Sequence, residues 1–465
     1  MKTNNIATPA TLASPWRERK TWVLFAMAFL GTCAVALMVQ LVLLPHYLPQ
    51  LHAGHGMLVG GDSAGMNLTA VDLAARIQKE GWSVWELRPA GNAPTGIAAA
   101  LYVFLTPEPY MLVPMNALVH AAGGITIYLI VCLISANRRA AVVAALPFLL
   151  FPSAASWYAQ IHKDGIFALG MLLCALGWMQ AFRPGFWASA RPASFAALVL
   201  PSVLGLFLVW LVRPHIMIMM QAVAMVVSVS GLLLAAFWWR LGVLQGMRIV
   251  LAAFVFVMIP LSVLLVKPSD YRVESWKGDV IARETVMPYM SGHCVLERGV
   301  NATVDKLSST VAAMRDFTIS GNSYKNAKSN MDTDFVPGTV CNLVGYLPRA
   351  LQIGFLAPFP AQWMADGSVA ANTLMRRVVS AEMLAVYACL PLLSVAMWAF
   401  RRKPEFWFVL GFLTLLMVIH VYLVPNLGTL HRMRYGFLTA VVGLALAGAV
   451  DRVLARRAVR LGSKP

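Results

Sequence analysis

Two acidic residues that lie directly beyond strongly apolar segments are the first candidates for chemistry in this chain. Asp62 lies in the run GGDSAGMNLTAVDLAARIQ, and Asp164 lies in WYAQIHKDGIF. Charge close to the hydrocarbon of a membrane is costly and is usually kept for a function. A carboxylate at the water-facing mouth of a site can act as a general base on a hydroxyl. Two loops that present Asp62 and Asp164 to one membrane face therefore indicate an active site.

Both acids also have a structural interpretation. Gly-Asp-Ser is ordinary turn chemistry, which could account for Asp62. Asp164 could cap a helix that begins at Gly165, and this would not exclude a second role in the site. In the site, Asp164 could hold a divalent cation, orient an acceptor or pair with Lys163.

Membrane-spanning helices are the elements expected to position these acids. Of the 465 residues, 59% are hydrophobic and only 12% are charged, and the mean hydropathy is +0.69. This composition is too apolar for a soluble protein. Because a spanning segment must satisfy its own backbone, we expect an all-α polytopic membrane protein and not a barrel.

Ten apolar runs predict ten spans, with both termini in the cytoplasm. They are residues 22–44, 110–134, 140–157, 166–182, 193–212, 215–236, 249–267, 378–400, 406–424 and 435–450. The first run is too long for a signal peptide, and no cleavage site follows it, so it is expected to be retained. The resulting regions are a cytoplasmic tail (1–21), a transmembrane module (22–267) with an external catalytic loop (45–109), an external region (268–377), C-terminal spans (378–450) and a basic cytoplasmic tail (451–465).

The net charge of +17 is expected to report membrane topology. Basic clusters separate the apolar runs and fall on one side of the ten-span arrangement, as short cytoplasmic loops require. They are Arg17, Arg19 and Lys20; Arg138 and Arg139; Arg183 and Arg191; Arg240 and Arg248; Arg401 to Lys403; and Arg452 to Lys464. We therefore expect no nucleic-acid partner.

The first external region contains two predicted helices. Apolar residues recur at near-helical spacing over 66–80, which is typical of a helix lying on the bilayer surface. Residues 94–105 are apolar but only about half a bilayer long, which favours a re-entrant or interfacial helix. Trp82 and Trp85 are expected at the headgroup level.

The second external region, 268–377, ends in an apolar stretch at 343–363 that three prolines interrupt. The prolines favour interfacial helices over another crossing. Cys294 and Cys341 both fall in this region, which the topology places outside, where disulfides can form. Either a bridge between them or two free thiols is compatible with the sequence.

Four segments resemble the glycosyltransferase C superfamily, whose members are membrane enzymes that transfer sugars from polyprenyl-phosphate donors. The likeness is to bacterial members similar to protein mannosyltransferases and aminoarabinose transferases, and it covers about the first half of the chain and the last span. The segments are GDSAGMNLTAVDLAARIQKEGW at 61–82, APTGIAAALYVF at 93–104, YAQIHKDGIF at 158–167 and HRMRYGF at 431–437.

This resemblance implies an inverting transfer with Asp62 as the base and a lipid phosphate as the leaving group. Cationic donors outside the membrane would bind that phosphate. The candidates are Arg213 and His215 in a short external turn, and His431, Arg432 and Arg434 before the last span, with Arg349, Arg376 and Arg377 as weaker ones. Lys163 and Tyr435 are candidates for orienting the acceptor.

Two features leave alternatives to this site open. Snorkelling to anionic headgroups would explain single external arginines equally well. The superfamily often carries adjacent acids in its first loop, whereas Ser63 follows Asp62 here, which puts a metal-binding version of the site in doubt. Glu382, inside a predicted span, could neutralise one of the weaker arginines.

The sequence therefore predicts a glycosyltransferase of a bacterial cytoplasmic membrane, with its site on the external, periplasmic face. Its expected partners are a polyprenyl-phosphate-linked sugar, membrane lipid and a saccharide or lipid acceptor, in the synthesis or modification of a surface polysaccharide. A close alternative is a repeat-unit polymerase of an O-antigen or exopolysaccharide. From another class, a transporter or flippase for lipid-linked sugars remains open, although no matching sequence halves are visible.

Overall fold

The architecture comes from a computed structural model that describes most of the chain outside one long internal region. The described residues are 15, 18–135, 137–183, 192–217, 219–220, 223–224, 226, 229, 311, 315, 327–335, 340–367 and 369–460. All named elements in these residues are helices. The all-helical class expected from composition is therefore confirmed for this part of the chain.

Five helical segments among the described residues are long and apolar enough to cross a membrane. They are Arg19–Tyr47 (α1 with η2), Pro109–Ile134 (η6 with α4), Asp164–Phe182 (α7 with η8), Pro404–Leu423 (α15) and Leu427–Arg457, the main part of α16 (Leu427–Arg460). Each coincides with a predicted span. The chain is therefore a membrane protein.

Two further predicted spans are bent helix pairs. Arg138–Leu150 (α5) meets Pro152–Tyr158 (η7 and α6) at 51°, and Ala370–Cys389 (α13) meets Leu392–Ala399 (α14) at 45°. Counting each pair as one span gives up to seven in the described residues. Pro152 and Pro391 lie at the two bends, where proline interrupts the helical hydrogen bonding.

The remaining predicted spans are only partly open to comparison. Pro192–Val212 (α8) is helical as expected, and its apolar part from Ala196 is shorter than the other candidate spans. The predicted span 249–267 and most of 215–236 lie outside the described residues.

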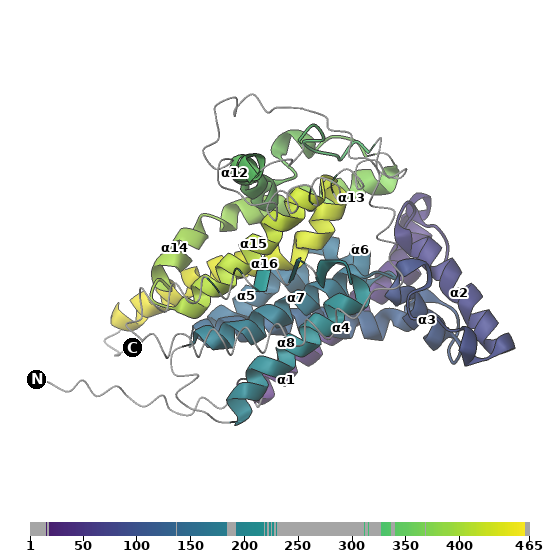
Figure 1. The fold of residues 1–465 in the computed structure, drawn as a ribbon, viewed down its shortest axis with the longest axis horizontal. Coiled ribbons are helices and arrows are strands. Elements are labelled where there is room, and N and C mark those ends of the chain that lie inside the picture. Colours follow the sequence, from purple (N-terminus) through teal and green to yellow (C-terminus); the bar gives the residue numbers. More distant parts are fainter. Residues whose placement is uncertain are drawn as a thin grey trace, which may run out of the picture.

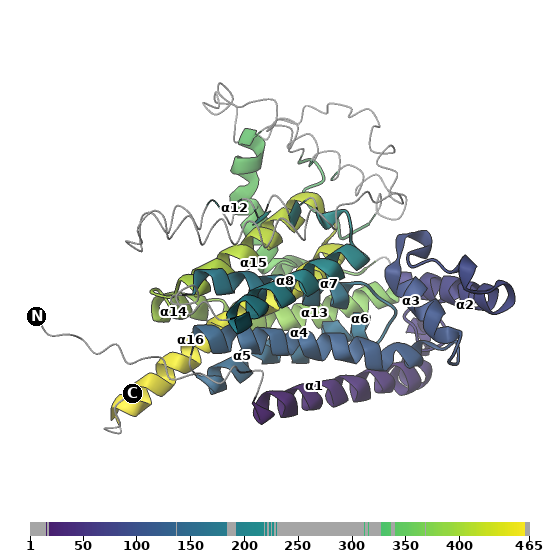
Figure 2. The same ribbon diagram turned by 60° about the horizontal axis from the view of Figure 1, so that its bottom comes forward.

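The helices form one bundle in which α7 lies between its neighbours in sequence and the C-terminal helices (Figure 1). It packs on α4, α8, α15 and α16, and fifteen of its sixteen residues are buried. Glycines bring α7 and α8 close together, since a Cβ atom on Gly170 would lie 2.8 Å from the carbonyl oxygen of Gly205. In contrast, α1 packs along α4 at the edge of the bundle and exposes Trp22, Met27 and Leu30 (Figure 2).

One end of the bundle carries the helices of residues 45–109, the first region that the sequence predicts to be external. Asp62–Glu80 (α2) and Ala93–Tyr102 (α3) project there, opposite the end where α16 finishes (Figure 1). The apolar face of α2, including Met66, Leu73 and Ile77, packs on α3. The apolar helix face predicted at 66–80 is thus confirmed. At least part of it packs on another helix, whereas the sequence predicted that it lies on the bilayer surface.

The second region predicted to be external, 268–377, contributes Val340–Leu356 (α12), which packs on α15. It is a helix with Pro348 inside it, and it is not among the candidate spans. Cys341, near its start, is disulfide-bonded. Cys294, which the sequence offered as a possible partner, lies outside the described residues.

Candidate functional site

Asp164 is buried at the start of α7, at the same end of the bundle as Asp62 at the start of α2. The helix begins at Asp164 and not at Gly165, and Lys163 holds the cap position without a side-chain cap. The Asp164 carboxylate is therefore free to accept other donors. Its Oδ1 atom lies 2.5 Å from Nη2 of Arg213, and the Asp164 side chain is only 2% exposed.

Arg213 reaches this carboxylate from the turn after α8. Its side chain is 9% exposed, and its guanidinium also lies 5.1 Å from the ring centre of Phe167. Asp164 therefore pairs with Arg213, and the hydrogen bond of Lys163 goes elsewhere. A buried pair of this kind holds both loops in place, because neither charge can be left alone without a large penalty.

His162 lies on the other side of Asp164. Its Nε2 atom is 2.7 Å from Nη1 of Arg432, and its Nδ1 atom is 3.1 Å from Oδ2 of Asp164. Arginine can only donate, so Nε2 must accept. The Nδ1 atom lies close to both the Asp164 carboxylate and, at 3.4 Å, the Asp164 amide nitrogen.

Arg432 connects the two acids named from the sequence. Its Nη1 atom lies 3.7 Å from Oδ2 of Asp62, and its Nε atom lies 3.7 Å from Oδ2 of Asp164. The Asp62 side chain is 56% exposed, and that of Arg432 is 27% exposed. Asp62 is the first residue of α2, after Gly61 in the cap position. One acid thus faces water, the other is sealed in, and Arg432 reaches both.

Lys163 adds a third cation to this group. Its Nζ atom donates to Oδ1 of Asn92 at 3.2 Å, which ties the loop before α7 to the loop before α3. Burial lowers the pKa of Lys163, and the charges of Arg213 and Arg432 lower it further, while Asp164 and Asp62 oppose them. A bound anion would favour the protonated amine.

The charges in this cluster do not balance. Three basic side chains (Lys163, Arg213 and Arg432) surround two carboxylates (Asp62 and Asp164), which leaves one positive charge in excess. His215, the other candidate in this turn, lies two residues after Arg213 and is only partly buried. A partly exposed site with excess guanidinium and ammonium groups suits a phosphate-type anion.

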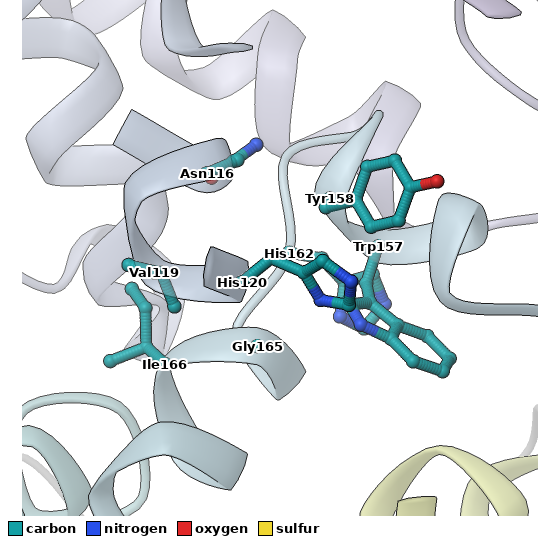
Figure 3. A pocket seen from close by; sticks show the side chains of 8 residues that line it. All are labelled: Asn116, Val119, His120, Trp157, Tyr158, His162, Gly165 and Ile166. Carbon is teal, nitrogen blue, oxygen red and sulfur yellow. The ribbon is translucent and has the colours of Figure 1, made fainter. Parts of the chain in front are cut away.

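A small pocket opens beside His162, between α4, α6 and α7 (Figure 3). It holds about 230 Å³ of empty space, part of which is open solvent. His120, Trp157 and Tyr158 line it with rings, and Asn116 adds an amide. His120 stacks on Phe148 with ring centres 5.0 Å apart, and its ring centre lies 4.7 Å from that of Tyr158, so aromatic rings in contact form part of the wall.

The other candidates before the last span face away from this cluster. His431 lies 3.3 Å from Oγ of Ser153, and the Tyr435 hydroxyl donates to the Phe148 carbonyl at 2.6 Å. Arg434 is 1% exposed and donates to the Ile353, Gly354 and Ala357 carbonyls at the end of α12. These three side chains pack the helices together in this arrangement.

The weaker candidates also have local partners. Arg349 pairs with Asp332 at 3.0 Å, and Arg376 donates to the carbonyls of Ala365 and Asp366. Arg377 lies 3.5 Å from Asp366. Glu382 contacts none of these arginines, contrary to the expectation from sequence. It accepts from the Ser153 amide at 2.6 Å, at the bend between α5 and α6.

No group of three or more His, Cys, Asp or Glu side chains in the described ranges could hold a metal ion. Two histidines of the first loop have other contacts: Nε2 of His52 accepts from the Gly56 amide, and His55 pairs with Glu108. Asp164, the proposed ligand for a divalent cation, is paired with Arg213 instead.

Sequence reasoning missed His162 and Asn92. His162 is two residues from Asp164 and inside the quoted YAQIHKDGIF run, so its polarity in an apolar context was a usable signal. Asn92 gave no signal, because an asparagine before a helix is ordinary loop chemistry. Comparisons with protein families, with curated proteins and with solved structures found no match.

Proposed function

We propose that this chain is a membrane glycosyltransferase that moves a sugar from a polyprenyl-phosphate donor to an acceptor hydroxyl, on the external face of a bacterial cytoplasmic membrane. The observation that carries the proposal is the position of Arg432 between an exposed carboxylate, Asp62, and a buried one, Asp164. A base and an anion site side by side at a bundle end are what such a transfer needs.

The proposed reaction is a single displacement that inverts the anomeric centre. The acceptor oxygen forms a bond to the anomeric carbon, while the bond from that carbon to the phosphate oxygen breaks. Asp62 takes the hydroxyl proton, and the electron pair leaves on the lipid phosphate. Arg432, Arg213 and Lys163 stabilise the negative charge that grows on that phosphate. Asp164 stays ionised and holds the two arginines.

Substitution of Asp62 tests this assignment. The purified protein in lipid vesicles is given synthetic polyprenyl-phosphate sugars, and both transfer and donor binding are measured. Asp62→Asn should remove roughly 100-fold or more of the transfer rate and leave donor binding intact. Asp72→Asn, an exposed acid on the same helix, is the matched control. Unimpaired transfer by the Asp62 variant would exclude it as the base.

The products of this assay separate transferase from polymerase. A transferase moves one sugar to the acceptor, whereas a repeat-unit polymerase lengthens a lipid-linked saccharide. The transferase is favoured because Asp62, half exposed at the start of α2, is available to take a proton.

Transport of lipid-linked sugars is the second candidate, and the two bent helix pairs favour it. Broken helices are common in transporters, where they line a path through the membrane. A labelled lipid-linked sugar that crosses vesicle membranes at a rate dependent on this protein, without sugar transfer, would replace the enzyme proposal.

A further inference from the structure

The loop before Asp62 is folded into a tight turn of its own. The Ala53 amide donates to the Met57 carbonyl at 2.8 Å, and the Val59 amide donates to the Leu51 carbonyl at 2.9 Å. Gly54 and Gly56, at the tip, have φ angles of +94° and +70°, which favour glycine. The chain therefore has a defined shape up to three residues before Asp62.

Gln160 joins this turn to the loop that carries Asp164. Its Nε2 atom donates to the Gly56 carbonyl at 3.1 Å, and its Oε1 atom accepts from the Leu58 amide at 3.1 Å. The Gln160 side chain thus donates to residue 56 and accepts from residue 58. A residue in a parallel β-strand forms the same two bonds with the strand beside it. Gln160 is 1% exposed, so no water competes for these bonds.

The backbone around Gln160 is held from the opposite side. Asn116 on α4 donates to the Gln160 carbonyl at 2.8 Å, and Gln40 in η2 donates to the Ala159 carbonyl at 2.7 Å. The two spans that flank the site thus fix the loop on which Gln160 lies. Leu58 precedes Asp62 by four residues, and Gln160 precedes Asp164 by four.

We propose that Gln160 is a positioning residue that sets the place of Asp62 relative to Asp164 and its arginines, an inference that rests on the proposed transfer reaction. The arginines are anchored on Asp164 and do not depend on the turn. Loss of the Gln160 bonds should therefore displace the base and leave the phosphate site in place. A small displacement of a reacting group costs rate much more than binding.

Gln160→Met is the first test, because methionine fills similar space without the two hydrogen bonds. Amide exchange in residues 52–60 should become at least about tenfold faster. The kcat for transfer should fall about tenfold or more, with the donor KM changed less than about twofold. Gln78→Met is the control, since Gln78 is exposed and its side chain donates to the Val103 carbonyl at 3.3 Å, far from the turn in sequence.

A pair of glycine substitutions reaches the same turn without touching Gln160. A Cβ atom on Gly56 would lie 2.7 Å from Cβ of Gln40, whereas one on Gly54 meets nothing within 4 Å. Both glycines have positive φ, so alanine strains both backbones similarly. Gly56→Ala should reproduce the loss in kcat, and Gly54→Ala should not.

The possible outcomes separate this inference from the proposed function. Faster exchange together with a loss in kcat supports it. Unchanged exchange in Gln160→Met shows that the bonds do not hold the turn, and faster exchange with unchanged kcat shows that they do not position the base; either result overturns the inference. If the wild-type protein transfers no sugar to any acceptor tested, the proposed function fails, and with it the positioning role, while the exchange measurement still decides whether Gln160 holds the turn.

Discussion

Two groups of arginines in this protein have opposite surroundings, although Arg432 of one group and Arg434 of the other are only two residues apart. Arg213 and Arg432 face carboxylates at the end of the bundle where α2 begins, and Arg432 keeps 27% of its side chain exposed. Arg434 and Arg315 are 1% and 2% exposed and donate to backbone carbonyls. A guanidinium between ionised groups and water can exchange a ligand, whereas one enclosed by carbonyls ties helices together.

The largest effect should come from Arg434. Arg434→Met leaves three carbonyls at the end of α12 without their donor, in a place that water does not reach. Unpaired buried groups of this kind cost about 1–3 kcal/mol each. We expect a clear drop in the thermal unfolding temperature in detergent. A variant as stable as wild type would show that these bonds do not hold α12 on α16.

Asp164 should affect both stability and activity. Asp164→Asn leaves Arg213 buried beside a neutral amide, and loss of one partner in a buried pair costs about 3–5 kcal/mol. Asp62→Asn, at a half-exposed position, should reduce transfer alone. The comparison is made by thermal unfolding and transfer assays on both variants. Equal stability of the two would contradict the buried anchoring role of Asp164.

Lys163 should make donor binding depend on pH. Its pKa is lowered by burial and by Arg213, so the amine loses its proton at lower pH than an exposed lysine. Donor affinity should therefore be highest while the amine is protonated and fall as pH rises through that lowered pKa. Lys163→Arg keeps its charge, so its donor affinity should stay level from neutral pH to about pH 10. A wild-type profile as flat as that of the variant would exclude Lys163 from the anion site.

The smallest effect is expected at the exposed pair of His55 and Glu108. Their atoms lie 3.0 Å apart, but the His55 side chain is 59% exposed. Exposed pairs contribute about 1 kcal/mol or less. Glu108→Gln should leave the unfolding temperature and the transfer rate nearly unchanged, in contrast with Asp164→Asn. A large drop in the unfolding temperature or the transfer rate would show that this exposed pair has an electrostatic role in the first loop.

Composition and hydropathy were sufficient for the membrane class and for most described spans, because each span must satisfy its own backbone in an apolar run. The convergence of Asp62, Asp164, Arg213 and Arg432 was a hypothesis from sequence, and the structure brings all four together. The bends at Pro152 and Pro391 were not predicted, since apolar runs continue across both.

From the sequence, Arg432, which contacts the two acids, was not separated from His431, Arg434 and Tyr435, which face away from them. The reason is that the start of the last helix was placed too late. It was predicted from residue 435, whereas α16 begins at Leu427. Within a helix, His431, Arg434 and Tyr435 share a face, and Arg432 lies about 100° around it. An earlier start would have separated Arg432 from the other three. The contacts of Gln160 were beyond sequence reasoning, because they join loops about one hundred residues apart.

The most direct test of this account is donor binding by Arg432→Gln. A photoreactive polyprenyl-phosphate sugar should label the wild-type protein and Arg456→Gln, an exposed arginine near the opposite end of α16, to the same extent. Labelling of Arg432→Gln should fall roughly tenfold or more, because a charge-assisted bond to the phosphate is lost. Its unfolding temperature should fall less than that of Asp164→Asn, because Asp164 keeps Arg213 as its partner. Equal labelling of the three proteins would contradict the claim that the partly exposed arginine between the two acids binds the lipid phosphate.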